Sequence, residues 1–286
     1  MTAGITGVDH VVIAVNDLDH AQAAYRRLGF TLSSRATHSA AVGTANHTIM
    51  LEDDYFELLS VLTPTDRNAR WREALADGEG VVGLAAATPG ALAARTAWVQ
   101  AGLSPGDVVA FSRPVERLRG IKTEARFEIV SLPMETLPGI GLFACAQLTR
   151  DAVWLPELVV HPNTAMAIRK LTVSVPDPLN ASGTWVRAFP GATAASIDGG
   201  ICIRPGRHAI DLLDPSTAAR RYRLAKPLER ARAVRLDLTV GTVDACRAAL
   251  VQGGATFASD GDRTAIGADQ ACGVVITLLP ASLPLM

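Results

Sequence analysis

The sequence has few cysteines and no excess of charge of either sign. Its 286 residues include four cysteines, which are widely spaced and form no C-x-x-C pair. No disulfide framework is implied, and we expect small buried thiols. Lysine and arginine number 27 against 28 for aspartate and glutamate, and no basic run is interleaved with aromatic residues. This balance gives no electrostatic support for nucleic-acid binding, and we expect a small-molecule partner instead.

Long hydrophobic segments are also missing. The first seven residues lack the basic and apolar regions of a secretory signal. The most apolar window, residues 80–94, is interrupted by Thr88-Pro89-Gly90 and is too short to span a bilayer. A phosphate-binding G-x-x-x-x-G-K signature is absent, so a nucleotide-dependent activity has no support. We therefore expect a cytoplasmic, soluble protein that does not associate with a membrane.

What the sequence does contain is a strand-and-helix pattern near its start. Residues 8–15 are rich in β-branched side chains and are bounded by turn residues, which predicts a strand. Asp17 is expected to cap a helix in which apolar residues recur on one face as far as Leu28, and Gly29 can supply the left-handed stop. Further strands of this unit are predicted at residues 30–32, 47–51 and 55–61.

The same pattern recurs three more times, and one bulky helix residue marks each copy. A shift of 73 residues aligns Tyr25 with Trp98, a shift of 160 aligns it with Trp185, and a shift of 225 aligns it with Leu250. Each unit is too small to bury a core alone, so the units must pack in pairs. The repeat therefore predicts an α+β fold of four βαβββ units in two pairs.

The two pairs correspond to two predicted domains. The first is expected to cover residues 1–160 and the second residues 165–286. Their units are predicted at residues 7–62, 81–149, 167–215 and 233–280. Residues 64–80 are interpreted as a connecting helix, residues 104–122 as a long polar excursion, and residues 220–226 as a solvated linker.

Three segments of the first unit carry a family resemblance. They are Asp9-His-Val-Val-Ile-Ala-Val15, Ala24-Tyr-Arg-Arg-Leu-Gly-Phe30 and Tyr55-Phe-Glu-Leu-Leu59. In a duplicated βαβββ framework they resemble the vicinal oxygen chelate superfamily, which includes glyoxalase, fosfomycin-resistance proteins and extradiol dioxygenases. More narrowly, Gly43-Thr-Ala-Asn46 and His161-Pro-Asn163 resemble bacterial glyoxalase-like domain proteins over about residues 7–165. The second half matches only through the repeat, which implies a degenerate second domain of the same kind.

The resemblance implies a cup in which a divalent metal binds the vicinal oxygens of a substrate. Metal ligands in the superfamily come from the first and last strands of a unit, which implies His10 and Glu57 here. An imidazole with a carboxylate suits Zn, Fe, Mn, Co or Ni, and the cofactor is expected to be one of these or none. The second unit has Gly83 at the position of His10 and offers Cys145 and Gln147 on its last strand. A catalytic metal normally has at least three protein ligands.

Other roles follow from the same resemblance. Glu57 is the expected catalytic residue, as metal ligand and proton carrier, and Gln147 or His47 could complete the ligand set. The substrate is expected to contact Asn46, His47, Tyr55, Arg126 and Gln147. Plainer interpretations stand beside these. His10 in an apolar strand is more often a buried, satisfied histidine, and Glu57 could pair with Arg126, although the strand spacing of Arg126 is also typical of a solvent face.

The second domain departs from the metal-binding pattern. Lys170 and Asp211 stand where the first domain has His10 and Glu57. A lysine ammonium has three donors and no lone pair, so we expect it to pair with Asp211 and to exclude a cation. The N-terminal pair of units is therefore expected to hold the working site, and the C-terminal pair to be a structural or regulatory copy.

Two classes of function remain open. One is a metal-dependent lyase, isomerase or dioxygenase, in which the metal polarises a carbonyl or enolate oxygen. The other is a metal-free, resistance-type protein that binds or sequesters a hydrophobic small molecule in the same cup. The pairing of His10 with Glu57 favours the enzyme, and the missing ligands of the second unit favour the binding protein. A monomer and a homodimer are both compatible with two pairs on one chain.

Overall fold

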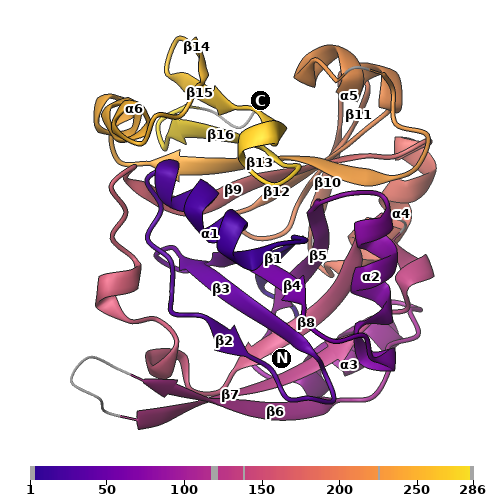
Figure 1. Ribbon diagram of the computed structural model, residues 1–286. Helices are drawn as coiled ribbons and strands as arrows, with labels where there is room; N and C mark the ends of the chain where they lie inside the picture. The colour runs from indigo at the N-terminus through magenta and orange to yellow at the C-terminus, as the bar shows by residue number, and fades with distance from the viewer. Residues whose placement is uncertain (1–3, 117–121, 138, 225, 284–286) are drawn as a thin grey trace.

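The computed structural model describes residues 4–116, 122–137, 139–224 and 226–283. Within these ranges the chain forms two eight-stranded sheets, and each sheet is built from one predicted pair of units (Figure 1). Strands β1 to β8 form the first sheet and strands β9 to β16 form the second. The predicted α+β fold of paired βαβββ units is confirmed. The predicted domain boundary between residues 160 and 165 stays a prediction.

The first sheet has the strand order β2-β3-β4-β1-β5-β8-β7-β6. Its strands are β1 (Gly7–Ala14), β2 (Ala36–Thr37), β3 (Thr44–Met50), β4 (Tyr55–Val61), β5 (Gly80–Ala87), β6 (Val109–Glu116), β7 (Lys122–Ser131) and β8 (Gly141–Gln147). Its helices are α1 (Leu18–Arg27), α2 (Ala69–Ala76) and α3 (Ala91–Gln100). Strand β1 is parallel to β4 and β5 is parallel to β8, while β1 and β5 meet antiparallel at the centre. The two units of the pair therefore face each other across this central contact.

The second sheet repeats this topology with the order β10-β11-β12-β9-β13-β16-β15-β14. Its strands are β9 (Ala165–Ser174), β10 (Thr193–Ile197), β11 (Gly200–Arg204), β12 (Ala209–Leu213), β13 (Arg232–Val240), β14 (Ala258–Asp260), β15 (Arg263–Ile266) and β16 (Val275–Pro280). Its helices are α4 (Pro178–Ala188), α5 (Pro215–Tyr222) and α6 (Val243–Gln252). Strands β9 and β13 take the central places that β1 and β5 have in the first sheet.

The repeated helices begin and pack as the sequence pattern predicts. The Asp17 carboxylate accepts hydrogen bonds from the backbone N–H groups of Asp19 and His20, which fixes the start of α1. The bulky residue of each repeat is fully or almost fully buried in α1, α3, α4 and α6; these residues are Tyr25, Trp98, Trp185 and Leu250. Each helix therefore covers its sheet with the same anchor.

One hydrophobic core runs between the two sheets. It combines side chains from β1, β5, β9 and β13 with the buried faces of the four repeated helices. Two hydrogen bonds cross it: the Tyr25 hydroxyl donates to the carbonyl oxygen of Ala271 at 3.2 Å, and Trp98 Nε1 donates to that of Ala188 at 2.8 Å. Helix α1 accordingly lies between the two sheets (Figure 1). The opposite face of each sheet is turned away from this shared core.

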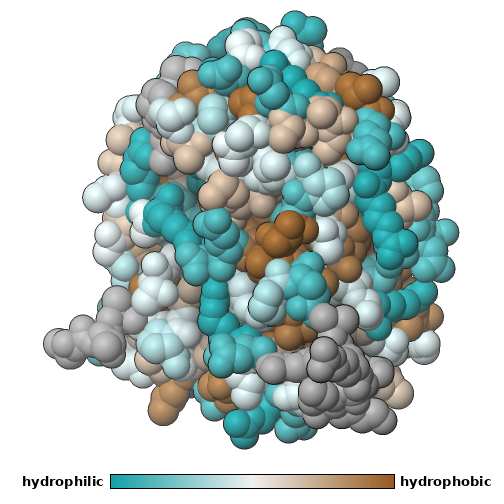
Figure 2. Space-filling model, turned by 90° about the vertical axis from the view of Figure 1, so that its left-hand side faces the viewer, coloured by the Kyte–Doolittle hydropathy of each residue, from teal (hydrophilic) through white to brown (hydrophobic). Residues whose placement is uncertain are grey.

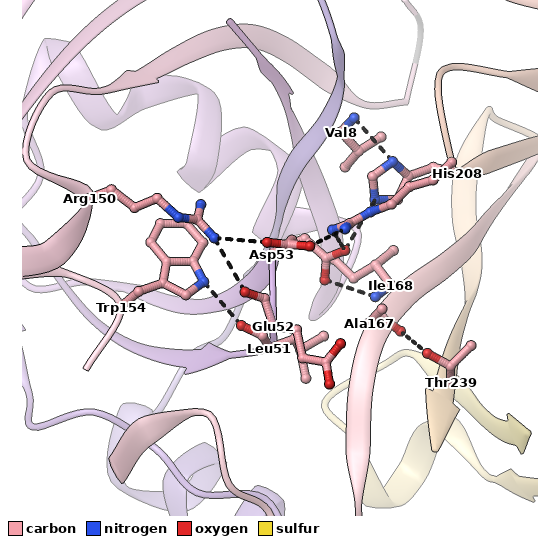
Figure 3. Close-up of polar contacts among 12 residues, drawn as sticks. Val8, Leu51, Glu52, Asp53, Arg150, Trp154, Ala167, Ile168, His208 and Thr239 are labelled. Atoms are coloured by element: carbon pink, nitrogen blue, oxygen red, sulfur yellow. Dashed lines mark hydrogen bonds and ion pairs between the residues drawn. The ribbon is translucent and has the colours of Figure 1, made fainter. Parts of the chain in front are cut away.

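A polar network joins the two sheets at the turn between β3 and β4 (Figure 3). Asp54 is fully buried there. Its carboxylate accepts from the backbone N–H of Ile168 at 2.8 Å, and it lies 2.6 Å from Arg207 Nη2 and 3.2 Å from His208 Nε2. His208 Nδ1 in turn accepts from the backbone N–H of Val8 at 3.4 Å. Residues from the second sheet thereby position the turn that leads into β4.

Several local predictions differ from the structure. Residues 30–32 form no strand, because the chain folds from the end of α1 into a loop and first pairs at β2. The polar excursion at 104–122 contains strand β6, paired with β7, and residues 117–121 lie outside the described residues. The segment 220–226 begins inside α5, and residue 225 is likewise outside the described part. The connecting helix within 64–80 is present as α2.

The surface agrees with the balanced composition. Figure 2 shows a face on which hydrophilic side chains predominate and hydrophobic ones reach the surface in small, separate groups. None of the helices in the described ranges combines the length and apolar character that a membrane crossing requires.

Candidate functional site

The candidate site lies on the face of the first sheet that is turned away from the shared core, and we call this face the first cup. Neighbouring strands are in register there: His10 of β1 pairs with Tyr55 of β4, and Val12 pairs with Glu57. Paired residues on adjacent strands point to the same face. His10, Tyr55 and Glu57 therefore share the cup, and all three are buried.

A β-bulge at the start of β1 brings a second acidic group into the cup. The register with β5 shifts between Val8 and His10, so Asp9 is the extra residue. Its Oδ2 atom lies 2.6 Å from Nδ1 of His10 and accepts a hydrogen bond from Gln147 Nε2 at 3.0 Å. Because an ionised carboxylate only accepts, Nδ1 of His10 is the donor in this contact, and Nε2 is the ring nitrogen on the side of Glu57.

Glu57 is held between an amide and the imidazole of His10. Its Oε1 atom accepts a hydrogen bond from Asn46 Nδ2 at 2.6 Å, and its Oε2 atom lies 4.0 Å from Nε2 of His10. The second distance is too long for a hydrogen bond. His10 Nε2 and Glu57 Oε2 therefore face each other with no bond between them.

An arginine of α2 adds a positive charge to this group. Burial lowers the pKa of Arg70, and the negative charge of Glu57 partly offsets that effect. The guanidinium carbon lies 4.1 Å from the ring centroid of Trp71 and 5.8 Å from that of Phe143, which are cation–π distances. Arg70 therefore places a cation in the electrostatic field of Glu57, inside an aromatic setting.

Aromatic rings close the cup. The ring of Tyr55 stacks on His10 with centroids 4.3 Å apart, and Trp154 meets Tyr55 edge-on at 5.5 Å. Arg150 lies over Trp154 at 3.6 Å, and Trp154 Nε1 donates to the carbonyl oxygen of Leu51 at 3.0 Å (Figure 3). Burial, as the main cause, raises the pKa of Tyr55 well above its usual value, so its hydroxyl stays protonated. The walls of the cup are apolar and its floor is polar.

Three buried polar atoms in this cup have no hydrogen-bond partner among the described residues. They are Oδ1 of Asn46, Nε of Arg70 and Oε1 of Gln147. Two are acceptors and one is a donor. Leaving a buried polar group unsatisfied costs about 1–3 kcal/mol each, so groups of this kind are uncommon in folded proteins. Their clustering indicates a place for a ligand that supplies the missing partners.

The cup supplies fewer metal ligands than a catalytic centre needs. Asp9, His10 and Cys145 lie close enough to form a candidate metal group. However, the 2.6 Å between Asp9 Oδ2 and His10 Nδ1 is a hydrogen bond, whereas two ligands of a tetrahedral ion stand about 3.3 Å apart for bonds of about 2.0 Å. Burial also raises the pKa of Cys145 well above its usual value, and a metal ligand must be the thiolate.

The other possible centre is His10 Nε2 with Glu57 Oε2. The 73-residue repeat places Gly83 at the position of His10. Phe143 is at the position of Glu57, because it pairs with Ala85 as Glu57 pairs with Val12. Neither side chain can bind a metal, and the guanidinium of Arg70 opposes a cation next to Glu57. The set is one protein ligand short of the usual three. A resident divalent metal therefore does not fit the residues of this cup.

The structure places the predicted site residues on two different faces. Asn46, Tyr55 and Gln147 lie in the cup with His10 and Glu57. His47 points to the opposite face, where it contacts Gln22 of α1 and the carbonyl oxygen of Ser33, because side chains alternate along β3. Arg126 alternates with the buried Ala125 and Phe127 and is exposed. These two positions do not meet the others.

The residues that sequence reasoning missed are Asp9 and Arg70. Asp9 belongs to the quoted family segment, but only the bulge turns it toward the cup. Arg70 lies in the connecting helix beside Trp71, but Arg72 flanks the same tryptophan, so the sequence does not indicate which arginine enters the cup.

Comparison with protein families gives a match over most of the first sheet and beyond it. The profile described as "Glyoxalase-like domain" matches residues 8–189, which is more than half of the chain. The matched segment extends beyond the first sheet into α4. No curated protein matches this chain.

Solved structures with the same architecture are numerous. A hypothetical protein from Staphylococcus aureus superposes with a TM-score of 0.69 at 11% identity, covering 96% of this chain and 98% of its own. A mutant of 4-hydroxymandelate synthase from Streptomyces coelicolor gives 0.64 at 12% identity, with 99% and 94% covered. A xylose isomerase-like TIM barrel/4-hydroxyphenylpyruvate dioxygenase fusion protein gives 0.61 at 12%, covering 99% of this chain but 50% of the fusion. At such identities the likeness concerns the fold.

Proposed function

The chain belongs to the glyoxalase-like domain family, and on that premise we propose that its first cup binds a small organic molecule without a resident metal. The ligand has an apolar or aromatic body. It presents a carbonyl or carboxylate oxygen to Arg70 and hydroxyl or N–H donors to Asn46 and Gln147. The protein acts as a binding or sequestering protein of the resistance type.

The observation that carries this proposal is the set of three unpartnered buried atoms. Arg70 Nε needs an acceptor, while Asn46 Oδ1 and Gln147 Oε1 need donors. A ligand with both an acceptor and donors can form hydrogen bonds with all three atoms. The free energy gained by satisfying these buried atoms adds to the affinity of the ligand. Apolar walls with a few convergent polar groups are the usual composition of a small-molecule site.

Each residue of the cup has a distinct part in this proposal. Arg70 anchors the acceptor oxygen, and the rings of Trp71 and Phe143 hold the guanidinium in place. The amides of Asn46 and Gln147 are already oriented, because each donates to a carboxylate and so turns its oxygen away from it. His10 Nε2 offers a further acceptor. The site is therefore preorganised, which lowers the entropic cost of binding.

Entry requires part of the cup wall to move. His10 is 3% exposed and Glu57 is 8% exposed, so the cup is covered. The covering side chains come from α2, through Trp71, and from the segment after β8, through Trp154. Both lie outside the sheet, so displacing either leaves the strands intact. We assign the opening to these two elements.

A metal-dependent lyase, isomerase or oxygenase is the second candidate function. It is favoured by the 4.0 Å approach of His10 Nε2 to Glu57 Oε2, with Asp9 fixing the imidazole. A carboxylate behind a histidine is common around metal ligands. This candidate needs a third ligand, and the unused oxygens of the cup are Oε1 of Gln147 and Oδ1 of Asn46 among the described residues.

Elemental analysis of the chain purified without chelators distinguishes the two functions. Our proposal predicts well below one divalent metal per chain, in the wild type and in His10→Ala alike. It also predicts saturable binding of small aromatic acids by isothermal titration, lost in Arg70→Gln. One metal per chain that disappears in His10→Ala supports the second candidate instead.

A further inference from the structure

The second sheet carries a cup of its own, on the face turned away from the shared core. Its floor follows the same strand register as that of the first cup. Lys170 of β9 pairs with Asp237 of β13, and the corresponding pair in the first cup is His10 of β1 with Ala85 of β5. Arg235 takes the place of Gly83. We call this face the second cup and define it by Lys170, Thr172, Asp211, Arg235, Asp237 and Thr277.

Four charged groups form a chain of contacts across this floor. Lys170 Nζ lies 2.8 Å from Asp211 Oδ2 and 3.9 Å from Asp237 Oδ2. Asp237 Oδ1 also accepts from Arg235 Nε. The two carboxylates are almost fully buried, at 1% and 4% exposure. Within this network of four groups, the two cations and the two anions compensate one another.

Such a network is an unusual way to fill the face of a sheet. Replacing a buried ion cluster by apolar side chains of similar volume is often neutral or stabilising, by about 1–4 kcal/mol. The first cup shows that the same fold accepts small or apolar residues here, since Gly83 and Ala85 stand where Arg235 and Asp237 stand in the second. Stability alone therefore does not account for the charges.

Two polar atoms at the edge of this network have no hydrogen-bond partner among the described residues. They are Oδ1 of Asp211 and Oγ1 of Thr277, and both are buried. The nearby thiol of Cys202 stays protonated, because burial and the Asp211 charge raise its pKa to about 11. A thiol is only a weak donor. Asp211 thus has an acceptor atom available on the floor of the cup.

A complementary donor edge stands at the side of the cup. Arg235 is fixed by its Nε bond to Asp237, and its guanidinium carbon lies 4.9 Å from the ring centroid of Tyr222 at the end of α5. The Tyr222 hydroxyl reaches Thr172 at 3.3 Å. Within the described ranges, the two terminal amino groups of Arg235 have no hydrogen-bond partner. A guanidinium held in this way presents a flat pair of donors that matches a carboxylate.

We propose that the second cup binds a small organic acid that carries a hydroxyl or ammonium group next to its carboxylate. The carboxylate pairs with the outer edge of Arg235, and the hydroxyl or ammonium group donates to Oδ1 of Asp211. The floor favours a zwitterion or a singly charged acid over a polyanion, because each added negative charge would meet two buried carboxylates. The Lys170 ammonium excludes a metal cation.

The test uses the full-length chain and defined probes. L-Alanine, L-lactate and acetate are titrated separately and followed by NMR chemical shifts in the wild type, Arg235→Gln and Arg70→Gln. We expect L-alanine or L-lactate to bind at least tenfold more tightly than acetate, with L-alanine above L-lactate if the partner group is an ammonium. Binding should be lost in Arg235→Gln and kept in Arg70→Gln, which alters only the first cup.

Any of three results overturns the proposal: no probe shows saturable shifts, saturable binding survives in Arg235→Gln, or saturable binding disappears in Arg70→Gln. If Arg235→Gln does not fold, Arg235→Lys keeps the charge beside Asp237 and removes the flat donor pair. Arg235→Lys should weaken probe binding about tenfold. Unchanged affinity in this variant would also overturn the proposal.

Discussion

Asp9 Oδ2 lies 2.6 Å from His10 Nδ1, although the two residues are neighbours in a strand and would normally point to opposite faces. The bulge in β1 makes this contact possible. It makes Nδ1 the donor and directs Nε2 toward Glu57, 4.0 Å away. The first cup thus contains an oriented imidazole and two carboxylates, with the Arg70 cation in the electrostatic field of Glu57.

Asp9→Asn tests this contact through stability. The substitution keeps the shape and removes the charge that accepts from both His10 and Gln147. Hydrogen bonds to charged groups contribute about 1.5–3 kcal/mol, and we expect the free energy of unfolding in urea to fall by about 2 kcal/mol. The exposed Asp107→Asn is the matched control, with a change within about 0.5 kcal/mol. Equal effects in the two variants would show that Asp9 is not held as described.

Arg207→Gln tests the junction between the two sheets. Arg207 pairs with Asp54, which is fully buried and so cannot regain water as a partner in the folded state. We expect the variant to lose about 2 kcal/mol of unfolding free energy, because a buried charge loses part of its compensation. Arg220→Gln removes an exposed pair with Asp198 and should change stability by less than about 0.5 kcal/mol. A loss no greater than that of the control contradicts the assignment.

His161 predicts a dependence of stability on pH. Its Nδ1 accepts from the backbone N–H of Thr31, and its Nε2 donates to the carbonyl oxygen of Met50. Burial lowers the pKa of His161 below 6.5. A lowered pKa means that stability is complete above pH 6.5 and is lost as the pH falls through the lower value of the folded state. Protonation of Nδ1 would also place its N–H against the backbone N–H of Thr31, so this hydrogen bond would be lost.

The corresponding measurement compares urea unfolding from pH 7.5 down to about pH 5 in the wild type and in His161→Asn. The wild type should lose stability below pH 6.5, and the variant should show a shallower slope there. A slope that is the same in both proteins would assign the acid sensitivity to other groups.

Phe143→His tests why the first cup lacks a metal centre. Phe143 holds the position in β8 that Glu57 holds in β4, and an imidazole there would add the missing ligand. We expect zinc affinity to rise by at least the roughly tenfold that even an outer-shell partner supplies, measured by competition with a chromophoric chelator. Phe143→Leu is the control. Tight zinc binding by the wild type, unchanged in Phe143→His, would show that the present residues already form a centre.

The sequence predicts the architecture well because the repeat is marked by large apolar residues, which bury the most surface on folding. Tyr25, Trp98, Trp185 and Leu250 recur at fixed shifts, and each is a helix anchor in the structure. Likewise, the pairing of Lys170 with Asp211 follows from complementary charges at matched strand positions and is observed at 2.8 Å. Large apolar residues and complementary charges at matched positions of the repeat can therefore be predicted from the sequence alone.

The composition of the site is harder to predict because it depends on register and on contacts between distant segments. A bulge of one residue turns Asp9 into the cup, and strand alternation turns His47 and Arg126 out of it. Arg70 reaches the cup only because α2 packs over the sheet, which the spacing of its own residues does not indicate. Sequence alone therefore predicts that His10 and Glu57 lie together, as the structure places them, but not which groups surround them.

Native mass spectrometry of the wild type and Arg70→Gln, each incubated with a set of small aromatic acids and with ZnCl₂, tests the central claim most directly. We predict a one-to-one adduct of an organic acid on the wild type, its loss in Arg70→Gln, and no retained zinc. Acid adducts of equal intensity on both proteins, or one zinc ion held by the wild type and lost in His10→Ala, would contradict a metal-free ligand site anchored by Arg70.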